Sequence, residues 1–153
     1  MKLLLDTTYF LPVIGISVRS FPRAAIIELI KGGYEISVSE ITFFELSAKG
    51  AKYVVTGALT PERVSKGIRA LLYDDRIDKI PIYDTSILLT AFKLRSILDD
   101  FIDCLILSSA INRADTLVTE DKDIQEVSDK KKFQDIIQLL NPKFKIKKLG
   151  DLL

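Results

Sequence analysis

The alternation of short apolar runs with longer amphipathic stretches is the feature that most constrains the fold of this 153-residue sequence. Five runs have the length, apolar residues and flanking polar residues of β-strands. They are the leucines before Asp6 and residues 34–38, 77–83, 116–119 and 144–149. Because this alternation is typical of parallel strands joined by helical crossovers, it predicts a three-layer α/β/α sandwich with a central, mostly parallel sheet of four to five strands.

The stretches between these runs carry helix start and stop signals. Ser39, Thr60 with Pro61, and Asp84 each precede an apolar periodic segment, as N-caps do. Gly50 would interrupt the helix that follows Ser39, and a break is expected near Ser128 in the last helical region. With no internal repeat and no low-complexity linker, residues 1–153 are expected to form a single domain.

Composition excludes several kinds of site. The chain has no histidine, which removes Ser-His-Asp and Cys-His nucleophiles, His-ligated zinc and the commonest general base. The lone Cys104 cannot form an internal disulfide or a thiolate metal cage, and a free thiol fits a reducing cytoplasm. No run reaches the roughly 18 apolar residues that span a bilayer, and Asp6 stops the first run too early for a signal peptide, so no membrane partner is expected.

Basic residues are concentrated near the carboxyl terminus, although the 22 basic and 21 acidic residues nearly cancel over the whole chain. Lysines alternate with apolar residues along the last predicted strand, at positions 143, 145, 147 and 148. They would either guard an exposed sheet edge or form a local nucleic-acid patch, and the first interpretation is favoured by about two to one.

Aspartates follow two of the predicted buried strands. Asp6 comes directly after three leucines, and Asp121 follows the run that ends at Thr119 and Glu120. Taken alone, Asp6 is equally well explained as the N-cap of the next helix. Ligands of open α/β sheets bind beyond the carboxyl ends of the strands, so two such aspartates would share one crevice if their strands are neighbours.

Two further acids lie within apolar helical stretches. Glu45 follows a pair of phenylalanines, and Asp103 begins an i, i+4, i+8 row with Leu107 and Ile111. A carboxylate in such surroundings is costly to desolvate unless a cation meets it. Asp99 and Asp100, one turn earlier, are also explained as charges that favour a helix amino terminus.

Electrostatics indicates what a cluster of these acids requires. Two carboxylates about 5 Å apart repel by roughly 3 kcal/mol at an effective dielectric constant near 20. Several could stay ionised together only around a cation, and oxygen ligands without His or Cys favour Mg²⁺ or Mn²⁺. These ions suggest phosphate chemistry.

Four segments of the sequence together resemble the PIN domains, and especially the VapC-type toxins of toxin–antitoxin pairs. In order they are LLLDTT, SEITFFEL, DCLILSSAI and LVTEDKDI, which extend over nearly the whole chain. The resemblance implies a metal-dependent endoribonuclease that acts on RNA phosphodiester bonds. Its metal ligands or water-positioning acids would be Asp6, Glu45, Asp103 and Asp121, with Asp123 serving a second metal and the hydroxyls of Thr7 and Thr119 supporting the site.

The same resemblance implies partners. An RNA substrate, an antitoxin protein and a second copy of the chain in a homodimer are expected.

The spacing to Ser109 and Ala110 matches the family pattern better from Asp103 than from Asp100. The segment between Gly50 and Tyr83 is longer than in many of these toxins.

Other functions remain open at this point. Phosphoaspartate enzymes and receiver domains also place Asp at a strand end, but the first kind needs an acid where Thr8 stands, and the order of acids is wrong for the second. The sequence therefore disfavours both of these classes. An RNA-processing PIN nuclease without an antitoxin, and a noncatalytic PIN module that binds RNA or protein, are the alternatives within the family.

Overall fold

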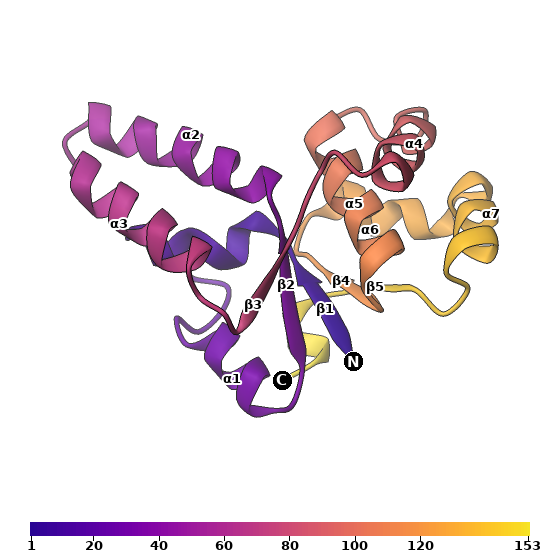
Figure 1. Ribbon diagram of the computed structural model, residues 1–153, viewed down its shortest axis with the longest axis horizontal. Coiled ribbons are helices and arrows are strands. Elements are labelled where there is room, and N and C mark those ends of the chain that lie inside the picture. The colour runs from indigo at the N-terminus through magenta and orange to yellow at the C-terminus, as the bar shows by residue number, and fades with distance from the viewer.

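A five-stranded sheet, in which all neighbouring strands are parallel, runs through the centre of the computed structural model, which describes residues 1–153 (Figure 1). Its order is β3-β2-β1-β4-β5. The strands are β1 (Lys2–Leu5), β2 (Glu35–Ser39), β3 (Ile77–Ile80), β4 (Thr116–Val118) and β5 (Lys145–Lys147). The predicted α/β architecture with a parallel central sheet is therefore confirmed.

Helices cover both faces of this sheet (Figure 1). One side carries a 3₁₀ helix η1 (Thr7–Ile14), α1 (Ala25–Lys31), α2 (Ile41–Val55) and α3 (Pro61–Leu72). The other carries α4 (Thr85–Leu94), α5 (Phe101–Arg113), α6 (Lys122–Glu126), the 3₁₀ helix η2 (Val127–Asp129) and α7 (Lys131–Leu140), and a last 3₁₀ helix η3 (Leu149–Asp151) follows β5. No helix is long and apolar enough to cross a lipid bilayer.

Strand β1 shows why the first leucines form the centre of the fold. Leu3 and Leu5 contribute to the core under η1 and α1, whereas Leu4 points into the core under α4 and α5. All three are at most 1% exposed. A strand with both faces covered needs apolar residues at consecutive positions, and this is the pattern of residues 3–5.

Two local predictions were wrong. Helix α2 continues through Gly50, because a side chain there would come within 2.6 Å of Val64 on α3, so glycine allows the two helices to pack closely. Asp84 stands at the N-cap position of α4 but makes no capping hydrogen bond, since its carboxylate pairs with Arg113 on α5. The predicted break near Ser128 is present as η2.

Gly67 on α3 makes a second close approach. A Cβ atom at this position would collide with the backbone carbonyl of Val13 in η1, so α3 can rest on η1 only if the residue has no side chain. This contact supports the segment that directly follows Asp6.

We expect Gly67→Ala to lower the free energy of unfolding by about 1–3 kcal/mol, because overpacking outweighs the better helix propensity of alanine. Chemical denaturation monitored by circular dichroism measures the change. Gly150→Ala is the matched control, since a Cβ there meets nothing within 4 Å. Equal stabilities of the two variants would contradict the close packing of α3 on η1.

Candidate active site

Strands β1 and β4 are hydrogen-bonded neighbours, so the two strand-end aspartates do lie at the same edge of the sheet. Leu5 is paired in register with Val118, and the backbone amide of Asp6 donates to the Val118 carbonyl at 3.0 Å. The condition that the sequence left open, whether the strands preceding Asp6 and Asp121 are adjacent, is met.

Asp6 is buried, and both of its carboxylate oxygens accept hydrogen bonds. Oδ1 accepts from the backbone amide of Thr7 at 2.7 Å, which makes Asp6 the N-cap of η1. Oδ2 accepts from the hydroxyl of Thr119 at 2.6 Å, at the end of β4. The helix-cap interpretation is therefore correct for one oxygen, while the other faces the end of the neighbouring strand.

Glu45 is joined to this edge through the hydroxyl of Thr7. Thr7 Oγ1 donates to Glu45 Oε1 at 2.5 Å and lies 2.8 Å from the hydroxyl of the buried Thr42. Because the single hydroxyl proton of Thr7 goes to the carboxylate, Thr42 is the donor in the second contact. Asp6 and Thr7 are adjacent in sequence. Through their hydrogen bonds they join Thr119, which follows β4, to Thr42 and Glu45 on α2 in one hydrogen-bonded array.

Asp103 and Asp121 line an open pocket of about 350 Å³ beside this array. Asp121 also caps α6, its Oδ1 accepting from the amide of Ile124 at 3.1 Å. The pocket is strongly acidic and has Lys130 as its one cationic side chain; its acids are Asp99, Asp100, Asp103, Asp121, Asp123 and Glu126. Neither Asp6 nor Glu45 is among its lining residues. In the hydrogen-bonded array next to the pocket, Asp6 is buried and Glu45 is half-buried.

The pKa values show that the two groups of acids share one electrostatic environment. Burial, followed by the charges of Asp100, Asp121, Asp6 and Glu45, raises the pKa of Asp103 to about 7. Burial raises the pKa of Asp6 and of Glu45, and Lys49 on α2 opposes the rise in both. These carboxylates are thus costly to ionise together, and a cation among them would lower that cost.

The residues fit a hard divalent ion in donor type and in charge, because they offer several carboxylate oxygens at one negative edge. As the side chains lie, no group of three or more acidic or thiol side chains is arranged to hold an ion. Asp6 is fixed by its two hydrogen bonds and Asp121 by the one that it accepts as the N-cap of α6, whereas Asp123 is exposed.

The neighbouring aspartates have distinct local roles. Asp100 caps α5, since its Oδ1 accepts from the amide of Ile102 at 2.8 Å. Asp99 is fully exposed and lies 3.8 Å from Arg95. Both line the acidic pocket, as Asp123 does, so the structure places all three next to Asp103.

Sequence reasoning missed four residues that the structure brings to this edge: Thr42, Lys49, Glu126 and Lys130. Thr42 and Lys49 stand three residues before and four residues after Glu45, which places all three on one side of α2. That spacing was available from the sequence. Glu126 and Lys130 flank η2, and only the turn of the chain there brings them to the pocket.

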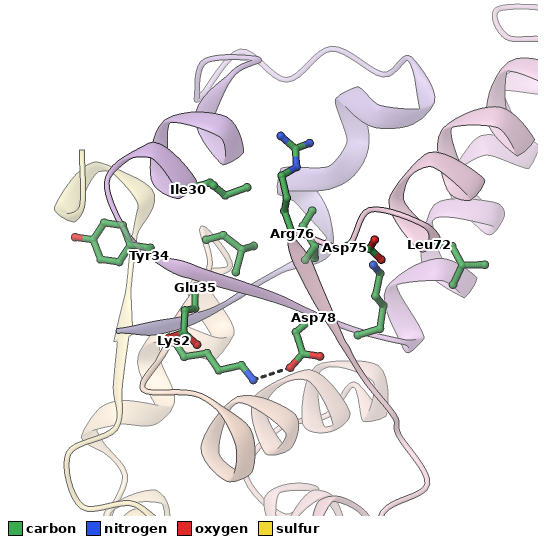
Figure 2. Close-up of a pocket in the computed structure, with 11 residues that line it drawn as sticks. Lys2, Ile30, Tyr34, Glu35, Leu72, Asp75, Arg76 and Asp78 are labelled. Atoms are coloured by element: carbon green, nitrogen blue, oxygen red, sulfur yellow. Dashed lines mark hydrogen bonds and ion pairs between the residues drawn. The ribbon is translucent and has the colours of Figure 1, made fainter.

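The largest hollow lies elsewhere, at the amino ends of β1, β2 and β3, and has a volume of about 830 Å³ (Figure 2). Its charges are mixed and largely paired, as the 2.6 Å contact between Lys2 and Asp78 illustrates. Arg76 binds Asp74 in the same region. Since ligands of such sheets bind at the opposite, carboxyl ends of the strands, size alone does not make this pocket the functional site.

Comparison with known proteins shows which family this chain belongs to. The family profile described as PIN domain matches residues 3–130, which contain every acid of the edge described above. The chain belongs to the PIN-domain family. No curated protein shows significant sequence similarity to this PIN domain.

Solved structures with a similar fold include three from toxin–antitoxin systems. A chain of VapBC2 from Rickettsia felis, bound to a DNA fragment from the promoter, superposes with a TM-score of 0.58 at 21% identity, covering 97% of this chain and 98% of that one. A toxin–antitoxin complex from Klebsiella pneumoniae superposes with a TM-score of 0.55 at 21% sequence identity, covering 85% of this chain and 93% of that one. A chain of VapBC-5 from Mycobacterium tuberculosis superposes with a TM-score of 0.55 at 18% sequence identity, covering 96% of this chain and 98% of that one. Identities this low establish the fold alone.

The raised pKa of Asp103 predicts a pH-dependent stability in metal-free solution. Between the ordinary aspartate value of 3.8 and about 7, the unfolded chain is ionised while the folded protein keeps the proton, so stability falls as pH rises. Asp103→Asn removes this penalty. We expect the variant to gain stability over the unmutated protein as pH rises from about 4 to about 7, reaching about 1 kcal/mol once partial exposure is allowed for.

Thermal unfolding across this pH range, with a chelator present, measures the difference. Asp135→Asn on the exposed face of α7 is the control and should show no such trend. A difference between Asp103→Asn and the unmutated protein that stays constant with pH would contradict the raised pKa.

Proposed function

We propose that this PIN-domain protein is a metal-dependent endoribonuclease that hydrolyses RNA phosphodiester bonds with Mg²⁺ or Mn²⁺. The observation that supports it best is the convergence of carboxylates from four distant segments at the carboxyl edge of β1 and β4. Membership of a family whose proteins are generally nucleases agrees with it. We propose further that residues 1–153 act as one domain, in which both helical layers share the sheet.

Asp6, Glu45, Asp103 and Asp121 are the proposed metal ligands or water-positioning acids, and Asp123 is the proposed acid for a second ion. A bound divalent ion would supply activation of water and neutralisation of charge on the phosphate. The chain's own contribution is positioning. Thr119 donates a hydrogen bond to Asp6, and Thr7 donates one to Glu45, so these two carboxylates keep their orientation beside the acids that line the pocket. Because the chain has no histidine, protons are transferred by a carboxyl group or by bulk water.

Asp103→Asn should reduce metal-dependent RNA cleavage by at least about a hundredfold, because it removes a charged oxygen donor while keeping the side-chain shape. The measurement is the cleavage rate of a mixture of structured RNAs with Mg²⁺, with Mn²⁺ and with a chelator. Asp6→Asn should behave alike, and Asp135→Asn is the folded control. Undiminished activity in both site variants, or cleavage that survives the chelator, would count against the assignment.

We propose that the protein is the toxin of a toxin–antitoxin pair and acts in the cytoplasm. The fold neighbours described above are toxin–antitoxin complexes, and Cys104 is a free thiol. The α2–α3 pair presents exposed apolar side chains that an antitoxin would cover: Phe44, Tyr53, Val55, Leu72 and Tyr73. An adjacent gene for a small antitoxin-like protein would favour this function, and its absence would favour an RNA-processing nuclease. A noncatalytic PIN module would bind RNA without metal-dependent cleavage.

A homodimer is proposed on the opposite side of the sheet. Leu89 and Phe92 on α4 are 55% and 60% exposed, and the ring of Phe92 stacks on that of Phe101 with centroids 5.8 Å apart. Such neighbouring exposed apolar groups are typical of an interaction surface.

Phe92→Ser should therefore shift the protein from dimer to monomer, since it removes the largest apolar group of that face. Light scattering after size-exclusion chromatography gives the mass. Leu139→Ser, on the exposed face of α7, is the matched control and should leave the mass unchanged. A dimer that survives Phe92→Ser would place the interface elsewhere.

A further inference from the structure

The edge strand β5 and the turn before it carry lysines that the proposed catalytic site does not use. We propose that Lys143, Lys145 and Lys147, here called the lysine strip, bind the phosphate backbone of single-stranded RNA and lead it toward the acidic edge. This inference rests on the proposed function for its biological meaning, but the binding itself can be tested separately.

The geometry of β5 places the side chains of Lys145 and Lys147 on one side of the sheet, and Lys143 in the preceding turn lines the same pocket. β5 pairs with β4 alone, with Lys145 opposite Thr116 and Lys147 opposite Val118. Ile146, between them, packs toward the core beneath α5 and α7, so its two neighbours point the other way. Alternate residues of a strand are roughly 6.6 Å apart, comparable with the separation of successive phosphates along an extended nucleic-acid strand.

The ammonium groups of the strip have no partners within the protein. None of the structure's ion pairs involves a lysine of the strip. The three lysines line a pocket of about 390 Å³ in which Asp115 is the sole acid. Asp115 is itself engaged, because its Oδ2 accepts from the backbone amide of Lys2 at 2.7 Å. The pocket therefore keeps a net positive charge, which complements a polyanion.

The strip ends beside the candidate active site. The carbonyl of Lys147 accepts a hydrogen bond from the amide of Thr119 at 2.9 Å, and the hydroxyl of Thr119 donates to Asp6. Since β5 is parallel to β4, a strand bound along it runs toward the carboxyl edge where the acids lie. The backbone of the last strip residue is thus one hydrogen bond away from the threonine that binds Asp6.

Electrostatics explains why an RNA-cleaving protein with this site needs such a strip. The pocket beside Asp103 is lined by acids and one lysine, so it repels phosphates until cations arrive. With a formal net charge of only +1, the molecule as a whole offers no attraction either. Binding energy must then come from a local basic surface, and the four lysines between positions 143 and 148, with no acid among them, supply one.

The competing explanation, a charged guard on an exposed sheet edge, makes a different prediction. A guard needs charge of either sign to prevent edge-to-edge pairing. It does not require every charge to be positive or to lack an acidic partner. Replacing the lysines by glutamates therefore preserves a guard but destroys an RNA-binding strip.

The experiment measures binding of a fluorescent single-stranded RNA oligonucleotide by anisotropy over a series of salt concentrations. All proteins carry Asp103→Asn, so that the RNA stays intact, and no divalent metal is added. The strip variant is K143E/K145E/K147E. Its matched control, K31E/K66E/K93E, changes three exposed lysines on α1, α3 and α4 and has the same net charge. A K143Q/K145Q/K147Q variant covers the case in which the glutamates disturb folding, which circular dichroism reveals.

We expect the strip variant to lose about tenfold or more in affinity near 0.1 M salt, and the glutamine variant to lose affinity in the same direction. Because each phosphate contact contributes about 0.7 to the slope of log affinity against log salt, that slope should become shallower by roughly 2. The control variant should bind as the parent does. Equal affinity and slope in the strip and control variants would overturn the proposal and leave the guard as the explanation.

The outcome separates this inference from the proposed function. If the strip variant loses RNA binding but the unmutated protein cleaves no RNA with Mg²⁺ or Mn²⁺, the strip stands and the nuclease assignment fails. If the unmutated protein cleaves RNA but the strip variant binds RNA as tightly as the control variant, the nuclease assignment holds and the proposal for the lysine strip is wrong.

Discussion

The pairing of β1 with β4 is the interaction on which the rest of the candidate site depends. It brings the residue after Leu5 beside the residue after Val118, so that the buried carboxylate of Asp6 meets the Thr119 hydroxyl at 2.6 Å. If the register of β1 against β4 shifted by one residue, every side chain of β1 would point to the opposite face of the sheet. Leu3 and Leu5 would then leave their core. The burial of three consecutive leucines therefore also holds the register of the site.

Threonine hydroxyls connect the acids that this register brings together. Thr119 serves Asp6, while Thr7 serves Glu45 and is itself held by Thr42. A buried carboxylate without such donors would carry its full desolvation cost. Even with them, burial raises the pKa of Asp6 and of Glu45, so both carboxylates are costly to ionise, and a divalent cation would lower that cost.

Charge is separated over the molecule, although the totals nearly cancel. Acids gather beyond the carboxyl ends of β1 and β4, and unpaired lysines follow the outer strand β5. The parallel sheet produces this separation, because it turns residues far apart in sequence into neighbours at one edge. A net charge of +1 therefore carries little information about which partners the surface can bind.

By itself the sequence determined the class of fold, the five strands and the segments that supply the acids, because apolar periodicity and strand-end residues are local properties. Two strong local signals misled it. Gly50 predicted a helix break, but α2 continues there and glycine allows close packing against Val64. Asp84 predicted a capping hydrogen bond, but its carboxylate pairs with Arg113 instead. Only the tertiary structure decided that β1 and β4 are adjacent, that Asp6 is buried and hydrogen-bonded to Thr119, and that Glu126 and Lys130 reach the pocket of Asp103. The physical reason is that strand order and side-chain burial arise from contacts between distant segments, which no local pattern encodes.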